Sequence, residues 1–131
     1  MDYEGVVIEE SLENRDVLGR VHMVSTKTEP VTEHHKTPWV EQWTLHTVEV
    51  PEHEAEKIAE QLAQALDSGH GHAWYADFKN DKTHFIIFHK KVFRVDRTKK
   101  EEYDTAVAYG RSLGIPGYQL DFSPLVKTWE R

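Results

Sequence analysis

The feature that most constrains the fold is a pair of segments rich in aromatic and β-branched residues, residues 72–79 and 83–89, on either side of the polar turn at 79–82. Segments of this composition around a short polar turn predict an antiparallel β-hairpin. A symmetric loop places Asp77 opposite His84. Because side chains alternate along a strand, one face is expected to be apolar and the other partly polar. The apolar face holds Trp74, Ala76, Phe78, Phe85 and Ile87, and the other face holds Tyr75, Asp77, His84 and Ile86.

The size and composition of the chain favour one domain with one core, because it has 131 residues of which 38% are hydrophobic and 11% aromatic. The chain contains no cysteine, which excludes disulfides, thiolate metal sites and a cysteine nucleophile. No apolar run reaches the roughly 18 residues of a membrane span, and the first residues lack the basic start of a secretory signal. We therefore expect a soluble cytoplasmic protein.

The N-terminal part of the chain, residues 1–29, predicts a β-hairpin with strands at 4–12 and 17–28. Residues 30–42 predict a long loop, because Pro30 and Pro38 each keep the preceding residue out of the helical region. Loops of this length in compact domains are often functional. Residues 123–131 predict a C-terminal tail.

Residues 43–122 predict the order strand, helix, strand, strand, helix, strand. The first helix follows from apolar residues spaced three and four apart, including Ile58 and Leu62, and the second from a capping-box pattern beginning at Thr98. This order resembles the ferredoxin-like arrangement. The resemblance implies an α+β fold with one antiparallel sheet, both helices on one face and the strands from Trp43 and Thr83 in the middle.

The face of the sheet left uncovered by this arrangement is where chemistry is expected. It would carry Tyr75, Asp77 and His84, so that Asp77 orients an imidazole base and Tyr75 serves as a proton donor. An open face with apolar groups is usually covered by something. Small ferredoxin-like proteins resemble one another in pairing sheet to sheet, which implies a homodimer.

The long loop offers a second part of the expected binding surface, because Trp adds a large apolar face and one hydrogen-bond donor to a pocket. The candidate ligand-binding residues at this surface are His35, Trp39, Trp43 and His46. Neither side of the strand at 43–50 is cleanly apolar, so the face on which His46 lies stays open. The first hypothesis is therefore the binding of a small molecule or a protein partner, and the alternative is a small acid/base or metal-assisted enzyme.

Metal binding has weaker support, although the chain has nine histidines. The candidate ligands are His34 in the long loop and the His70-Gly-His72 pair, but no spacing fixes three ligands locally. We therefore predict no metal site and cannot name a cofactor from the sequence.

The charge distribution gives a third hypothesis. The net charge is −7, which disfavours general nucleic-acid binding, yet residues 79–100 contain eight Lys or Arg and two Asp, a local charge of +6 that leaves −13 elsewhere. The second alternative is therefore anion or nucleic-acid binding at a basic patch. The patch comprises Lys90, Lys91, Arg94 and Arg97.

Overall fold

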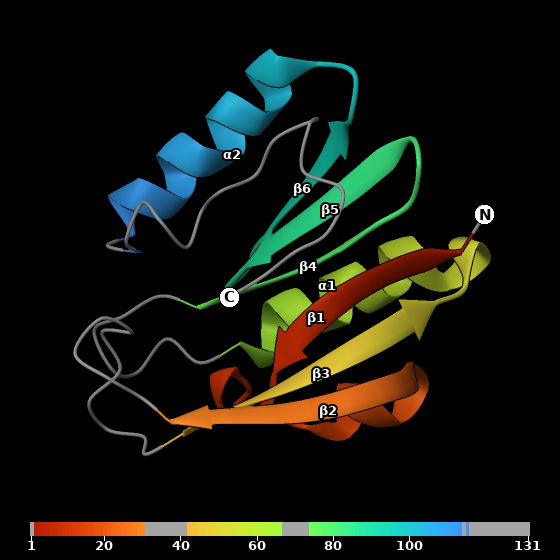
Figure 1. The fold of residues 1–131 in the computed structure, drawn as a ribbon. Coiled ribbons are helices and arrows are strands. Elements are labelled where there is room, and N and C mark those ends of the chain that lie inside the picture. Colours follow the sequence, from red (N-terminus) through yellow and green to blue (C-terminus); the bar gives the residue numbers. More distant parts are fainter. Residues whose placement is uncertain (1, 31–41, 67–73, 114, 116–131) are drawn as a thin grey trace.

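The computed structural model describes residues 2–30, 42–66, 74–113 and 115 (Figure 1). The strands are β1 (Tyr3–Ile8), β2 (His22–Pro30), β3 (Gln42–Val50), β4 (Tyr75–Lys79), β5 (Thr83–Phe88) and β6 (Lys91–Asp96). The α-helices are α1 (Ala55–Ala65) and α2 (Lys100–Ser112), and the short 3₁₀ helices are η1 (Glu9–Ser11), η2 (Asp16–Arg20) and η4 (Glu52–Glu54). No helix in this part of the chain is long and apolar enough to cross a membrane.

The six strands form one antiparallel sheet in the order β2-β3-β1-β4-β5-β6. The predicted N-terminal hairpin is wrong, because β3 lies between β1 and β2 and residues 16–20 form η2. A central position suits β1 because Tyr3, Val7 and Ile8 are buried, whereas nearly all of β2 is exposed at the sheet edge.

Gly5 allows β1 to approach β4 closely. It pairs with Phe78, and a Cβ at this position would lie 1.9 Å from the carbonyl oxygen of Asp77 and 2.5 Å from Cα of Phe78. Since both of these neighbours are backbone atoms, no side chain can be accommodated without moving a strand.

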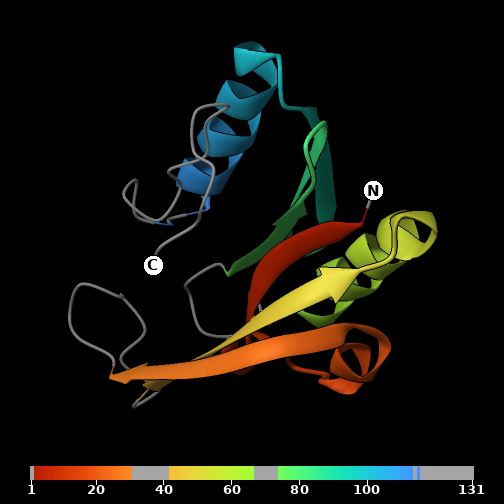
Figure 2. The ribbon, with the colours of Figure 1, turned by 45° about the vertical axis from the view of Figure 1, so that its right-hand side comes forward.

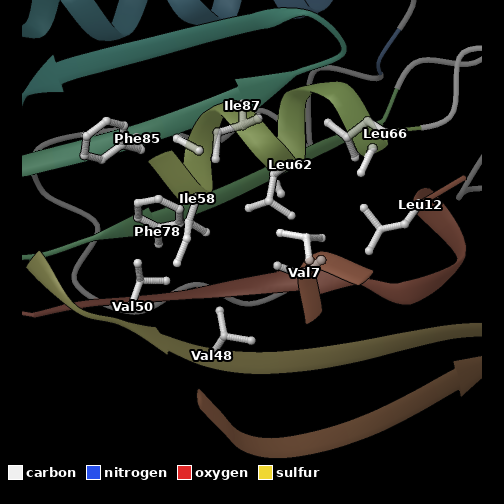
Figure 3. Close-up of a cluster of buried hydrophobic side chains, with 14 of the residues drawn as sticks. Val7, Leu12, Val48, Val50, Ile58, Leu62, Leu66, Phe78, Phe85 and Ile87 are labelled. Atoms are coloured by element: carbon white, nitrogen blue, oxygen red, sulfur yellow. The ribbon is translucent and has the colours of Figure 1, made fainter. Parts of the chain in front are cut away.

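The two helices cover opposite faces of the sheet (Figures 1 and 2). On one face, Ile58 and Leu62 of α1 belong to the same buried cluster as Phe78 of β4 (Figure 3). On the other face, α2 packs through Tyr103 and Ala106. Its partners in the sheet are Tyr75, Ile86, Phe88 and Val95. The predictions of both helices on one face and of an open face around β4 and β5 are therefore wrong.

The sequence of β5 explains this arrangement. Residues 85–88 are an uninterrupted apolar run, Phe-Ile-Ile-Phe, and all four are buried. A continuous apolar run is typical of a strand that is covered on both faces, whereas a strand with one open face alternates apolar and polar residues. Both helices are therefore needed to exclude water from β5.

The strand order also departs from the ferredoxin-like prediction. The strands from Trp43 and Thr83, β3 and β5, are separated by β1 and β4 rather than adjacent. An edge strand that was not predicted, β6, follows β5 through a turn in which Lys90 has a positive φ of 59°. The predicted last strand at 118–122 and the tail lie outside the described residues.

The central hairpin has the two predicted faces but a different register. Asp77 pairs with Ile86, and Lys79 pairs with His84, so β5 is displaced by two residues from the predicted pairing. A shift of two residues keeps every side chain on its face, whereas a shift of one would invert them all. Asp77 and His84 are consequently diagonal neighbours on the same face.

Candidate functional site

A buried chain of hydrogen bonds joins β4, β5 and α2. Nε2 of His84 lies 2.8 Å from Oδ2 of Asp77, and Nδ1 of His84 lies 3.0 Å from the hydroxyl of Tyr103. His84 and Asp77 are only 1% and 2% exposed. Because a carboxylate only accepts, the Nε2–H of His84 donates to Asp77, and the Tyr103 hydroxyl donates to Nδ1. Asp77 and His84 are therefore in contact, as predicted, and they lie beneath α2.

The surroundings of His84 favour the neutral form of its imidazole. Burial lowers the pKa of His84 from its ordinary value of 6.5, and this effect outweighs the hydrogen bond and charge of Asp77, which raise it. The positive charges of Lys79 and Arg97 lower the pKa of His84 further. Burial also raises the pKa of Tyr103 above its ordinary value of 10.0, so its hydroxyl stays protonated and can donate.

The phenol in this chain comes from a residue that the sequence analysis did not assign to the site. Tyr103 lies in α2, 19 residues after His84, so its contact with His84 is nonlocal. The predicted proton donor, Tyr75, is buried, and its ring packs against Phe88 with centroids 6.2 Å apart. Since α2 covers His84, the hydrogen bonds that join Asp77, His84 and Tyr103 hold the helix against the sheet. Catalysis by His84 stays a prediction.

A second polar array lies where β2, β3 and η1 meet. Thr26 Oγ1 lies 2.9 Å from Nδ1 of His46, and Nε2 of His46 lies 3.1 Å from Oε1 of Glu9. His46 is buried, whereas Thr26 is exposed on the edge strand. The guanidinium of Arg15 lies 3.4 Å from the other carboxylate oxygen of Glu9. The open question about the face of His46 is thereby answered, because its ring lies on the side covered by η1.

A hollow of about 580 Å³ lies between η2 and the outer side of α1. Buried Val17 and Ala65 provide apolar surface, and the charged lining residues are Asp16, Arg20, Lys57 and Glu60. The remaining lining residues are Asn14, Gln61 and Gln64. No local sequence pattern marks this hollow, because its charged residues lie in two segments about forty residues apart.

The other predicted site residues that the structure describes lie on different parts of the sheet. Trp43 is buried, and its ring packs against Trp74 with centroids 5.4 Å apart. Arg94 lies over the ring of Phe85 on the α1 face, whereas Lys91 lies over the ring of Phe93 on the α2 face. The basic patch is therefore divided between the two faces of β6.

Several candidates cannot be placed. Those outside the described residues are His34, His35, Trp39, His70 and His72. Within the described ranges, no group of three or more His, Asp or Glu side chains is arranged to hold a metal ion.

Comparison with known proteins gives no match to a family model, a curated protein or a solved structure.

Proposed function

We propose that the protein binds a small polar molecule that carries both a positive and a negative group, in the hollow between η2 and α1. The observation that supports this proposal is a concavity of about 580 Å³ lined by charged side chains of both signs. Ligand pockets for small molecules typically measure about 300–1,000 Å³ and combine apolar surface with a few convergent polar groups.

The charged side chains of the hollow are available to a ligand. In the described ranges, no ion pair involves Asp16, Arg20, Lys57 or Glu60. Arg20 and Lys57 would meet an anionic group, and Asp16 and Glu60 a cationic group. Val17 and Ala65 would contact the apolar part between them.

Gln61 adds a further argument. Its side-chain oxygen Oε1 is buried and has no hydrogen-bond partner among the described residues. A buried polar atom without a partner is unfavourable by roughly 1–3 kcal/mol, so a donor on a bound molecule would recover this energy. The side chain lines the hollow, and a bound ammonium group is the kind of donor that it would accept.

The proposal can be tested by NMR titration of ¹⁵N-labelled protein with 6-aminohexanoate, which carries both charges. Hexanoate and hexylamine are matched probes with one charge each. We expect 6-aminohexanoate to shift amide signals of residues 14–20 and 57–65, and each single-charge probe to bind about tenfold more weakly, because a charge-assisted contact contributes roughly 1.5–3 kcal/mol.

Two substitutions provide a matched pair. Lys57→Gln should weaken the response to 6-aminohexanoate, whereas Lys100→Gln, on an exposed part of α2 next to Asp104, should leave it unchanged. The proposal is wrong if the three probes give the same response or if shifts avoid the hollow.

A further inference from the structure

We propose that Thr26 is an activated hydroxyl that accepts an acyl group from small esters, with His46 as its base and Glu9 as the residue that positions His46. This inference does not depend on the hollow between η2 and α1. The two hydrogen bonds, 2.9 Å from Thr26 Oγ1 to Nδ1 of His46 and 3.1 Å from Nε2 of His46 to Oε1 of Glu9, form a hydroxyl–imidazole–carboxylate chain. A nucleophile bonded to a base that a third group orients is the structural signature of covalent catalysis.

The fold brings these three groups together from distant parts of the chain. Thr26 of β2 pairs directly with His46 of β3. On its other side, β3 pairs with β1, with Val7 opposite His46, and η1 begins two residues after Val7 at Glu9. The carboxylate of Glu9 therefore reaches the imidazole from η1, which follows the strand on the other side of β3. Figure 1 shows β2 at the sheet edge next to β3.

Glu10 holds η1 in place. Its two carboxylate oxygens accept hydrogen bonds from the backbone N–H and the hydroxyl of Thr44, at 2.5 Å and 2.7 Å. Since Glu10 follows Glu9 directly, these contacts fix the position from which Glu9 meets His46. His46 is itself only 6% exposed, so surrounding atoms restrict the orientation of its ring.

The chain of hydrogen bonds defines where the proton sits. A carboxylate only accepts, so the Nε2–H of His46 donates to Glu9. In the neutral imidazole Nδ1 then carries a lone pair, which accepts the hydroxyl proton of Thr26. The arrangement thus has the direction of proton transfer that a general base requires. Thr26 is exposed on β2, so an acyl donor can approach this residue from solvent.

The proposed reaction with an ester has two steps. In the first, the Thr26 oxygen forms a bond to the acyl carbon, its proton passes to Nδ1 of His46, and the bond from the acyl carbon to the leaving oxygen breaks. His46 then gives this proton to the leaving alkoxide, or to solvent when the leaving group is p-nitrophenolate. In the second step, a water molecule gives a proton to His46 and its oxygen forms a bond to the acyl carbon. The bond from the acyl carbon to the Thr26 oxygen breaks, and His46 returns the proton to Thr26. The products are the carboxylic acid and the alcohol. Alternate N–H groups of an edge strand point away from the sheet, so such a group on β2 would be the donor to the developing oxyanion.

The substrate class follows from the exposure of Thr26 on a sheet edge. Esters with a small acyl group and a good leaving group, such as p-nitrophenyl acetate, match a nucleophile that lies on an open surface. The leaving p-nitrophenolate also needs no proton from the protein.

The experiment incubates the full chain with p-nitrophenyl acetate and follows release of p-nitrophenolate, with the acetylated residue mapped by peptide mass spectrometry. We expect acetylation at Thr26, its loss in Thr26→Val, and its retention in Thr26→Ser. His46→Gln should slow acetylation at least about 100-fold, the usual contribution of a general base. The control is Thr28→Val, since Thr28 is also exposed on β2 but pairs with Thr44 and should leave the rate unchanged.

Glu9→Gln tests the positioning role, because an amide in place of the carboxylate holds the Nε2–H of His46 less strongly; Thr26 acetylation should slow, and its pH profile should differ from that of the unchanged protein. Thr26 is on the surface, so Thr26→Val is expected to fold, and circular dichroism will check each variant. The inference is overturned if acetyl groups appear only on lysine or histidine, if Thr26 and Thr28 are labelled equally, or if Thr26→Val retains the rate.

Discussion

Loss of the hydrogen bond between Tyr103 and His84 should lower the free energy of unfolding, and the burial of His84 determines by how much. Tyr103→Phe removes the hydroxyl that donates to Nδ1 of His84 over 3.0 Å and leaves the ring contacts in place. His84 is 1% exposed, so water cannot readily replace the lost donor. The cost is therefore that of a buried unsatisfied acceptor, about 1–3 kcal/mol, rather than the smaller net value of an ordinary hydrogen bond.

The assay is urea unfolding followed by far-UV circular dichroism and by the fluorescence of Trp43 and Trp74, both of which are buried. A loss of about 1–3 kcal/mol corresponds to a factor of roughly 5–160 in the ratio of folded to unfolded protein. The midpoint should fall without a change in the slope m, because the surface exposed on unfolding stays the same.

Tyr109→Phe is the matched control on the same helix. The ring of Tyr109 packs against Phe88 and Phe93 at centroid distances of 5.2 Å and 5.4 Å, and no hydrogen bond of its hydroxyl is present in the described ranges. Its removal should change stability by less than about 0.5 kcal/mol. If both variants lose the same free energy, the hydrogen bond to His84 does not fasten α2 as argued.

Three further predictions concern stability. The pKa of His84 in the folded protein lies below the ordinary value of 6.5. The unfolded protein therefore binds more protons than the folded protein between that pKa and pH 6.5. The free energy of unfolding should be highest above pH 6.5 and should fall as the pH decreases from 6.5 to the folded-state pKa. Urea titrations across this range check the slope, which should flatten in His84→Gln. Gly5→Ala should cost about 1–3 kcal/mol or prevent folding, because the new Cβ meets backbone at 1.9 Å, whereas Gly19→Ala, with no neighbouring atom within 4 Å, should be nearly neutral by thermal melting. Leu62→Asp should abolish cooperative unfolding, because an unpaired charge would enter the core beneath α1.

Parts of the fold could be predicted because their signals are local. The stripe of α1 is a periodic pattern, and the alternation of β4 and β5 assigns each side chain to a face. The register was wrong because residues 79–82 allow more than one loop centre. Asn80 fixes the register, because its side-chain oxygen accepts hydrogen bonds from the N–H groups of Lys82 and Thr83, both at 2.9 Å. The turn therefore centres on Asp81 and Lys82.

The rest of the fold depends on contacts between distant segments. Residue spacing does not specify that β1 lies between β3 and β4, although Gly5 in an apolar strand is a sign of close backbone approach. The apolar run at 85–88 was the available sign that helices cover both faces of β5.

In the candidate sites too, local contacts could be predicted from the sequence, whereas contacts between distant segments could not. Asp77 and His84 could be brought together by alternation along one hairpin, but Tyr103 comes from a helix beyond the next strand. Glu9, Thr26 and His46 belong to three elements, so no sequence motif unites them.

The central position of β1 has a consequence for the order of assembly. Its neighbours come from residues 42–50 and 75–79, so the strand made early in synthesis has no partner until much more of the chain has left the ribosome. The pair β2-β3 and the trio β4-β5-β6 are adjacent in sequence within each group, and in the described sheet β1 joins the two groups. The pairing of β1 with β3 and β4 should therefore form last during folding. A synthetic peptide of residues 3–8 would compete with β1 for this position in the sheet.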